Sequence, residues 1–126
     1  MAHTLEHDKE NGVIRVRHHG AVDKKDIWDS HGRLLRLLND DDPARIFVDM
    51  KKSDLRISKF EGYEFSVSLA KLLPPEARVA VIKQQDGSHD GDLMFMKTVC
   101  ANNGLEMKLF TDDLDAEHWL LAQRTH

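Results

Sequence analysis

Two carboxylates and one histidine are the candidates for acid–base catalysis, because they are predicted to lie at the ends of strands. Asp49 and Asp54 follow a short apolar run, and His89 lies in a polar loop after a second apolar run. If these runs are buried parallel strands, the three groups lie at strand ends, where paired carboxylates can divide acid and base roles. Two nearby aspartates are common in loops, however, and no glycine-rich phosphate loop follows any predicted strand. We therefore expect a protein that is not an enzyme.

Metal binding is the next chemistry to consider, because the chain contains 8 histidines. His18 and His19 are neighbours in a predicted strand and so point to opposite faces. No His-Glu-x-x-His pair is present. His31 and His118 lie on apolar helical faces, where a core histidine with satisfied hydrogen bonds is the expected state. These positions predict no native metal site and no cofactor.

A second metal hypothesis concerns the polar loop at residues 86–92. Asp86, Ser88 and Asp90 are spaced like the first ligands of a calcium loop, with a glycine at the sharp turn. The last position of such a loop needs a bidentate glutamate, and Lys97 stands there instead. The flanking elements are a strand and a helix rather than two helices. We interpret the loop as a solvated connection that leads into the following helix.

Length and composition predict one ordinary globular domain covering residues 1–126. The chain has 126 residues, 40% of them hydrophobic and 32% charged, with a net charge of −4. The negative charge argues against nucleic acid as a main partner. No apolar run approaches the length of a membrane span, and the acidic N-terminus does not resemble a signal peptide. The single cysteine, Cys100, cannot form an intrachain disulfide, so we expect a cytoplasmic protein.

Strand and helix patterns alternate along the chain. Asn11-Gly12 predicts a tight turn, so the chain opens with a hairpin whose first strand lies at the sheet edge. Pro74-Pro75 ends a helix that begins at Ser58. The predicted order is β-β-α-β-α-β-α-β-α, which indicates an α/β fold with a mainly parallel sheet. The strands are centred on residues 3–9, 13–19, 46–49, 79–82 and 107–110, and each of the last four is followed by a helix.

The closing segment resembles small bacterial SpoIIAA-like proteins of the STAS/SEC14 type. Asn103-Gly104, Phe110 and Trp119-Leu120 match a helix, a turn, a strand ending in Phe and a short helix ending in Trp-Leu. In outline the resemblance extends from residue 12 to residue 119. It implies a SpoIIAA-like βα superhelix, with a mixed five-stranded sheet and an antiparallel edge strand at the N-terminus.

The sequential strand order that the resemblance implies has a physical consequence. Right-handed crossovers between sequential strands put successive helices on one face of the sheet. Parallel strands with continuous apolar runs need cover on both faces. Something else must therefore cover part of the other face, and a second copy of the chain is one candidate.

Ser58 is the candidate regulatory residue. In anti-sigma-factor antagonists of the STAS type, a serine at the start of the corresponding helix is phosphorylated, and Ser58 occupies that place. The family context is Asp-Ser-Ser-Gly, whereas this chain has Arg56-Ile57-Ser58-Lys59. Ser58 and Glu61 also have the spacing of a helix-capping box, which explains the serine without any modification.

The helix that begins at Ser58 carries two apolar stripes. One stripe can pack on the sheet, and the other could contact neighbouring helices, a partner chain or a lipid-like ligand. The leading hypothesis is a non-enzymatic interaction or regulatory module, most simply a homodimer, that resembles anti-sigma-factor antagonists. The alternative is a binder of an apolar or amphipathic small molecule, and the third hypothesis is a small enzyme that uses carboxylates at the C-terminal ends of strands. The candidate surface consists of Phe60, Tyr63, Phe65, Val67, Leu69 and Leu72.

Overall fold

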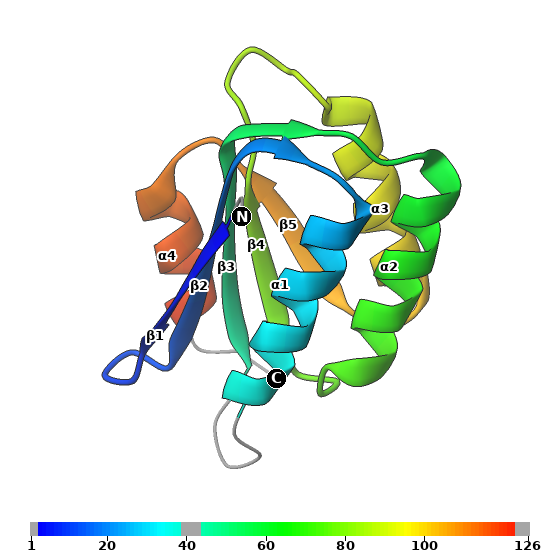
Figure 1. The fold of residues 1–126 in the computed structure, drawn as a ribbon. Helices are drawn as coiled ribbons and strands as arrows, with labels where there is room; N and C mark the ends of the chain where they lie inside the picture. Colours follow the sequence, from blue (N-terminus) through cyan, green and yellow to red (C-terminus); the bar gives the residue numbers. More distant parts are fainter. Residues whose placement is uncertain (1–2, 39–43, 123–126) are drawn as a thin grey trace.

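The computed structural model describes residues 3–38 and 44–122 and contains the predicted alternation of strands and helices (Figure 1). The order is that expected from the sequence. The elements are β1 (His3–Asp8), β2 (Val13–Val22), α1 (Lys24–Leu37), β3 (Arg45–Leu55), α2 (Lys59–Leu72), β4 (Arg78–Ile82), α3 (Asp90–Asn102), β5 (Glu106–Phe110) and α4 (Asp113–Leu121).

The five strands form one mixed sheet in sequential order, β1-β2-β3-β4-β5. β1 and β2 form the predicted antiparallel hairpin, and β2 to β5 are parallel. Gly12 has a positive φ of 68° at the hairpin turn, a conformation that glycine adopts without strain. The continuous apolar runs of β3 and β4 lie in the middle of the sheet, where both of their faces are covered.

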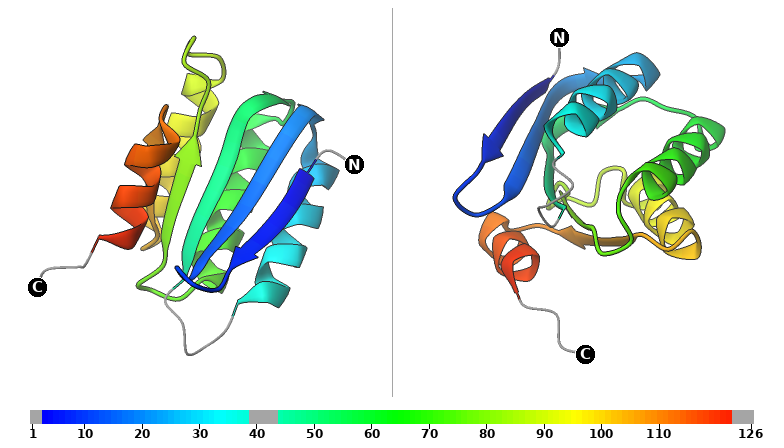
Figure 2. Two further views of the ribbon diagram at one scale, coloured as in Figure 1. Left: turned by 90° about the vertical axis from the view of Figure 1, so that its left-hand side faces the viewer. Right: turned by 90° about the horizontal axis from the view of Figure 1, so that it is seen from below.

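The sheet is covered by three helices on one face and by one on the other (Figure 2). α1, α2 and α3 lie side by side on the first face, as right-handed crossovers between sequential strands require. α4 packs on the second face, against β3, β4 and β5. The predicted need for cover on the second face is thus met in part by the chain itself.

The α4 face of the sheet divides into an apolar half and a charged half. The apolar half contains Phe47 and Ile82, which pack against Ala116 and Leu120 of α4. Next to it, Arg15 binds Glu117 of α4 with its Nη2 at 2.7 Å from Oε1. The charged half can therefore face solvent beside α4 without leaving apolar surface exposed.

α4 presents a different side to the sheet from the one its sequence suggested. His118 and Leu114 are exposed, whereas Ala116 and Leu120 are buried. The expectation that His118 belongs to an apolar buried face was wrong. The small Ala116 allows this nine-residue helix to lie close to the sheet, so the buried side is set by size as well as by hydrophobicity. None of the described helices is long and apolar enough to cross a membrane.

β3 continues beyond Asp49, where the sequence suggested that the strand ends and a polar loop begins. After a register irregularity between Arg17 and His19, β2 and β3 pair again until Val22 lies opposite Leu55. In Figure 1 this extension curves away from the sheet and passes over one end of the helix layer. The hydrophobic pattern did not indicate this part of the strand, because its residues are mostly polar. Pairing with β2 holds it in place, and hydrophobic burial does not.

Candidate functional site

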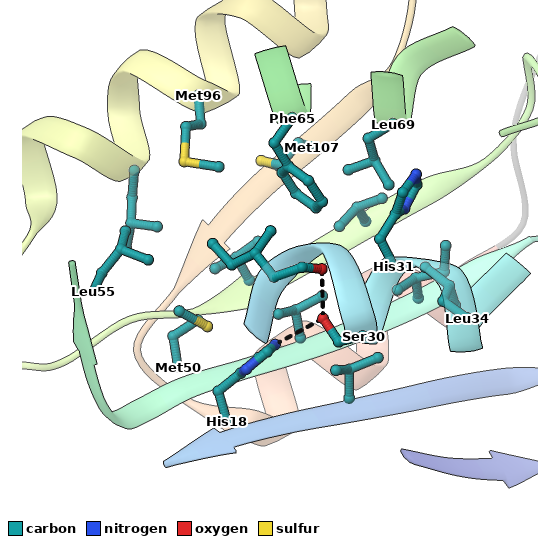
Figure 3. A pocket seen from close by; sticks show the side chains of 17 residues that line it. His18, Ser30, His31, Leu34, Met50, Leu55, Phe65, Leu69, Met96 and Met107 are labelled. Atoms are coloured by element: carbon teal, nitrogen blue, oxygen red, sulfur yellow. Dashed lines mark hydrogen bonds between the residues drawn. The ribbon is translucent and has the colours of Figure 1, made fainter. Parts of the chain in front are cut away.

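A cavity of about 80 Å³ lies between the sheet and the layer formed by α1, α2 and α3 (Figure 3). Side chains from four strands and all three helices line it. It is the space left where the three helices diverge over a twisted sheet. No cavity could be located from sequence patterns, because its size depends on how the helices pack.

The cavity wall is mostly aliphatic and sulfur-containing. Met50, Met96 and Met107 contribute three flexible side chains from β3, α3 and β5. Methionine adapts to irregular space because it is unbranched and polarisable. This wall can therefore adjust its shape around an apolar occupant at low cost. The remaining apolar lining residues are Val16, Ile27, Leu34, Ile46, Val48, Leu55, Phe65, Leu69, Val79, Val81 and Leu93.

Three polar side chains interrupt this wall: His18, Ser30 and His31. His18 comes from β2, on the same side as Val16, and points to Ser30 of α1 (Figure 3). The Ser30 hydroxyl lies 3.0 Å from the carbonyl oxygen of Ile27 and 3.4 Å from Nε2 of His18. Both histidines and the serine are buried, so each polar atom needs a partner inside the protein.

His18 is buried as a neutral imidazole. Burial lowers its pKa to about 4, and the neighbouring His3 acts in the same direction. The His3 and His18 rings are 5.6 Å apart across the β1–β2 pair. Arg33 lies with Nη1 3.1 Å from Nε2 of His3 and, after burial, also lowers the pKa of that ring. Since a guanidinium only donates, His3 accepts this bond on Nε2 and carries its proton on Nδ1.

His31 is buried without hydrogen bonds to either ring nitrogen. The expectation of a core histidine with satisfied hydrogen bonds was therefore wrong. The ring is held by edge contacts to Trp28 and Phe65, with centroid distances of 5.7 and 5.3 Å. Burial alone lowers its pKa, because no charged partner compensates the lost hydration.

The β3 extension, whose Leu55 lines the cavity, contacts the loop that leads into α3. His89 of this loop has a left-handed φ of 65°, which is unusual for a side chain other than glycine. Its Nε2 lies 3.2 Å from the backbone nitrogen of Leu55 and 3.1 Å from Oδ1 of Asp54. A backbone N–H can only donate, so a neutral ring that accepts it has no Nε2 proton to give Asp54. Nε2 of a neutral His89 ring can therefore bind only one of these two partners at a time.

A smaller cavity of about 10 Å³ lies between the β3 extension and this loop. Met50, Leu55 and Leu93 line both this space and the larger cavity. Gln84 and His89 line only the smaller one, and the Gln84 amide donates to the Ser53 carbonyl at 2.7 Å. The two spaces are thus neighbours that share walls, at the end of the sheet where the predicted strand-end groups lie.

The structure gives Asp49 and Asp54 different partners. Asp49 accepts hydrogen bonds from the Arg17 guanidinium at 2.9 Å and from the Lys51 backbone at 3.0 Å. Asp54 contacts Arg56 and His89. The hydrogen bond from the exposed guanidinium of Arg56 contributes most to lowering the pKa of the Asp54 carboxyl. Ion pairing thus occupies each carboxylate separately, so they do not form the pair considered from the sequence.

The calcium-like loop uses its carboxylates for its own structure. Asp86 accepts from the backbone nitrogen of Ser88 at 2.9 Å, and Lys83 places its Nζ 3.0 Å from both oxygens of Asp90. Within residues 3–38 and 44–122, no group of three or more His, Cys, Asp or Glu side chains could hold a metal ion. Cys100 is fully buried, and burial raises the pKa of its thiol to about 11, which keeps it protonated and unreactive.

Ser58 caps α2 in the way its spacing with Glu61 predicts. The Ser58 hydroxyl accepts the Glu61 backbone N–H at 3.1 Å, and the Glu61 carboxylate accepts the Ser58 backbone N–H at 2.8 Å. Ser58 is also exposed, so the cap leaves its hydroxyl at the surface. The hydroxyl therefore has a structural role whether or not it is ever modified.

The six apolar residues singled out on α2 separate into different environments. Phe60, Tyr63 and Leu72 are 67%, 47% and 53% exposed. Leu69 is buried and Phe65 is partly buried, and both line the cavity. Val67 is half-buried. One helix therefore contributes both to the cavity wall and to an exposed apolar surface, which we call the α2 surface and define as Phe60, Tyr63 and Leu72.

His18 and Ser30 were not identified from the sequence as cavity residues, although the strand pattern contained one indication for His18. The alternation in β2 places His18 on the same face as Ile14 and Val16, toward the helices. Ser30 gave no signal, because a serine in the middle of a helix is usually explained by a bond to the preceding turn. That bond exists here, but it also fixes how Ser30 meets His18.

The first prediction concerns the α2 cap. Ser58→Ala removes the acceptor for the Glu61 amide and should lower the free energy of unfolding by about 1 kcal/mol. Ser58→Asp should keep most of it, because a carboxylate also caps. Urea unfolding measures both, and Ser68→Ala, in the interior of the same helix, is the control. An unchanged stability in Ser58→Ala would show that the cap contributes nothing.

The second prediction concerns pH. An unfolded chain takes up a proton on His18 near pH 6.5, whereas the folded chain does so only near pH 4. The unfolded state binds more protons in this window, so the free energy of unfolding should fall as the pH drops from 6.5 to 4. The His18 contribution is about 3 kcal/mol at the lower limit.

His18→Leu should remove this part of the pH dependence in urea unfolding at about pH 7 and about pH 4.5. His118→Leu, at an exposed position, is the matched control and should unfold with the pH dependence of the original chain. Equal pH dependence in both variants would contradict the neutral, desolvated state of His18.

The chain is similar in structure to a crystallised uncharacterised protein of the DUF3478 family from Shewanella loihica PV-4, which has a SpoIIAA-like fold. The two share 19% sequence identity with a TM-score of 0.62, over 94% of this chain and 92% of that one. No protein-family model matches the chain, and no curated protein matches it. The mixed sheet in sequential order, with three helices on one face and one on the other, is a SpoIIAA-like fold.

Proposed function

We propose that this protein binds a small apolar or amphipathic molecule in the cavity between the sheet and α1–α3, and that it does so without catalysing a reaction. The observation that carries the proposal is the cavity itself. Its wall is apolar except where His18, Ser30 and His31 meet it, and buried ring nitrogens there lack partners. Binding pockets commonly combine an apolar wall with a few polar groups that orient the ligand.

The size of the cavity limits the ligand. An engineered apolar cavity of about 150 Å³ in another protein binds benzene. A cavity of about 80 Å³ suits a molecule of roughly four heavy atoms, or a slightly larger one if Met50, Met96 and Met107 move. A whole phospholipid would not fit in this state, so the proposed ligand is small or inserts only the end of a chain.

Several features support a binding role over an enzymatic one. Asp49 is held by Arg17, Cys100 is a buried neutral thiol, and the two cavity histidines are held neutral by burial. A bacterial setting, which the resemblance suggested, and a cytoplasmic one, which the single cysteine suggested, are part of the same proposal.

The third prediction tests this binding. Chains labelled at the methionine methyl groups should show NMR shift changes at Met50, Met96 and Met107 when 1-butanol is added. Met94, which is 50% exposed on α3, is the internal control and should not shift. The reason is that the first three side chains line the cavity and the fourth does not.

A variant that fills the cavity should remove the response. Val48→Phe places a ring in the space from the side of β3, and these shifts should then be lost. Leu114→Phe adds the same ring at an exposed position of α4 and should bind as the original chain does. Methyl shifts that are absent in the original chain, or that persist in Val48→Phe, would contradict binding in this cavity.

A second candidate function is protein interaction through the α2 surface. Phe60, Tyr63 and Leu72 are exposed on one helix, and Met94 of the neighbouring α3 is also exposed. Exposed apolar side chains on neighbouring elements favour a partner, which could be a second copy of the chain. A homodimer or a regulatory partner, with Ser58 at the start of the same helix, is the form this candidate takes.

The fourth prediction tests the α2 surface. Replacing both Phe60 and Tyr63 with Ala should convert a dimer into a monomer in size-exclusion chromatography with light scattering. Stability should change little, within about 0.5 kcal/mol per site, because both residues are exposed. Leu114→Ala, at an exposed site on α4, should leave the dimer intact. A monomeric original chain at high concentration would contradict self-association through this surface.

A further inference from the structure

We propose that the cavity selects an uncharged ligand that carries a hydrogen-bond donor, specifically a small aliphatic alcohol, and that Nδ1 of His18 accepts the ligand hydroxyl. This inference rests on the proposed function and adds the chemical class of the ligand. Its starting point is the pair of contacts made by the Ser30 hydroxyl, of which the one to the Ile27 carbonyl is shorter than the one to His18 (Figure 3).

Ser30 determines which nitrogen of His18 carries the proton. A serine hydroxyl has one hydrogen to donate, and here it goes to the Ile27 carbonyl at 3.0 Å. Ser30 can then only accept from His18, whose Nε2 lies 3.4 Å from the hydroxyl oxygen. The His18 proton is therefore on Nε2, and Nδ1 carries a free lone pair.

That lone pair has no partner in the protein. Nδ1 of His18 is buried and lacks a hydrogen bond, and the whole side chain is 95% buried, since only 5% of it is exposed. A buried acceptor without a partner destabilises the folded protein by about the hydration free energy that the acceptor lost on burial. A ligand that brings a hydroxyl hydrogen to this nitrogen recovers that free energy, whereas an ether or an alkane does not.

His31 adds a second, less selective polar group. Its ring is neutral and only 4% exposed, and neither nitrogen has a partner. One nitrogen is a donor and the other an acceptor, so His31 can serve either end of a hydroxyl dipole. His18 alone requires a donor, and it therefore sets the selectivity.

Charged ligands are excluded by the rest of the wall. None of the described side chains that line the cavity is acidic, lysine or arginine. A carboxylate or an ammonium would enter without a counter-charge and would lose its hydration. A carboxylate would also place its acceptor oxygens against the acceptor Nδ1 of His18. The cavity volume of about 80 Å³ matches a chain of roughly four carbons.

The fifth prediction compares four ligands of one chain length at about pH 7.5: 1-butanol, 1-chlorobutane, butyrate and butylammonium. Methionine-methyl NMR gives a dissociation constant for each from the shifts of Met50, Met96 and Met107. 1-Butanol should bind about tenfold more tightly than butyrate and butylammonium, because both ions lose hydration without compensation. 1-Chlorobutane has no hydrogen-bond donor, so its affinity measures the contribution of the apolar wall alone.

The matched variants are His18→Leu and His18→Asn. His18→Leu should weaken 1-butanol about threefold to tenfold, the value of one buried hydrogen bond, and should not weaken 1-chlorobutane, which meets a more apolar wall. His18→Asn keeps an acceptor near the Nδ1 position and should retain most of the preference for the alcohol. The retained 1-chlorobutane affinity shows that both variants fold and keep the cavity.

The outcomes separate the two levels of the proposal. If 1-chlorobutane binds but 1-butanol shows no dependence on His18, or butyrate binds as well as 1-butanol, the inferred selectivity is wrong and cavity binding stands. If neither 1-chlorobutane nor 1-butanol shifts the three cavity methionines, cavity binding itself is wrong. If the alcohol preference is present and is lost in His18→Leu alone, both are supported.

Discussion

The parallel pairing of β2 with β3 is the interaction on which the rest of the structure depends. It joins the N-terminal hairpin to the parallel sheet and places His18 beneath α1. It also continues after a register irregularity, so that Val22 and Leu55 pair beyond the edge of the main sheet. This continuation brings Leu55 over the end of the helix layer, where it lines both cavities.

The two faces of the sheet are covered in different ways. On the face of α1 to α3, apolar side chains are buried under three helices that do not fill all the space between them. On the other face, the single helix α4 covers an apolar half, and ion pairs such as Arg15–Glu117 and Arg17–Asp49 make the remainder compatible with water. A partner is therefore not required to complete the fold, and an interface at the α2 surface would be an addition to it.

The sequence was informative where a local pattern determines the structure. The capping box of Ser58 and Glu61 was visible as a residue spacing, and it is formed. The order of strands and helices, and the antiparallel edge strand, also followed from patterning. The length of β3 did not, because Lys51 to Asp54 are polar and the strand there is held by β2. The buried side of α4 did not either, because it depends on how closely the small Ala116 lets the helix approach.

The candidate site was less predictable than the fold because it is a product of packing. The sequence placed Phe65 and Leu69 on an apolar stripe, and the structure shows them at a cavity wall. It placed His31 in the core, but only the three-dimensional arrangement shows that both of its nitrogens lack partners. The role of Ser30 depends on two distances from one oxygen atom, to residues on different elements. Such relations have no local sequence signature.

Nε2 of His89 can bind either Leu55 or Asp54, and this has a consequence for the dynamics of the loop that leads into α3. When Nε2 of His89 accepts from the backbone N–H of Leu55, the loop residue His89, with its left-handed φ of 65°, is tied to β3. Each excursion of the loop away from β3 must break this bond and expose the amide to water. The exchange rate of the Leu55 amide hydrogen therefore reports how often this loop moves away from β3.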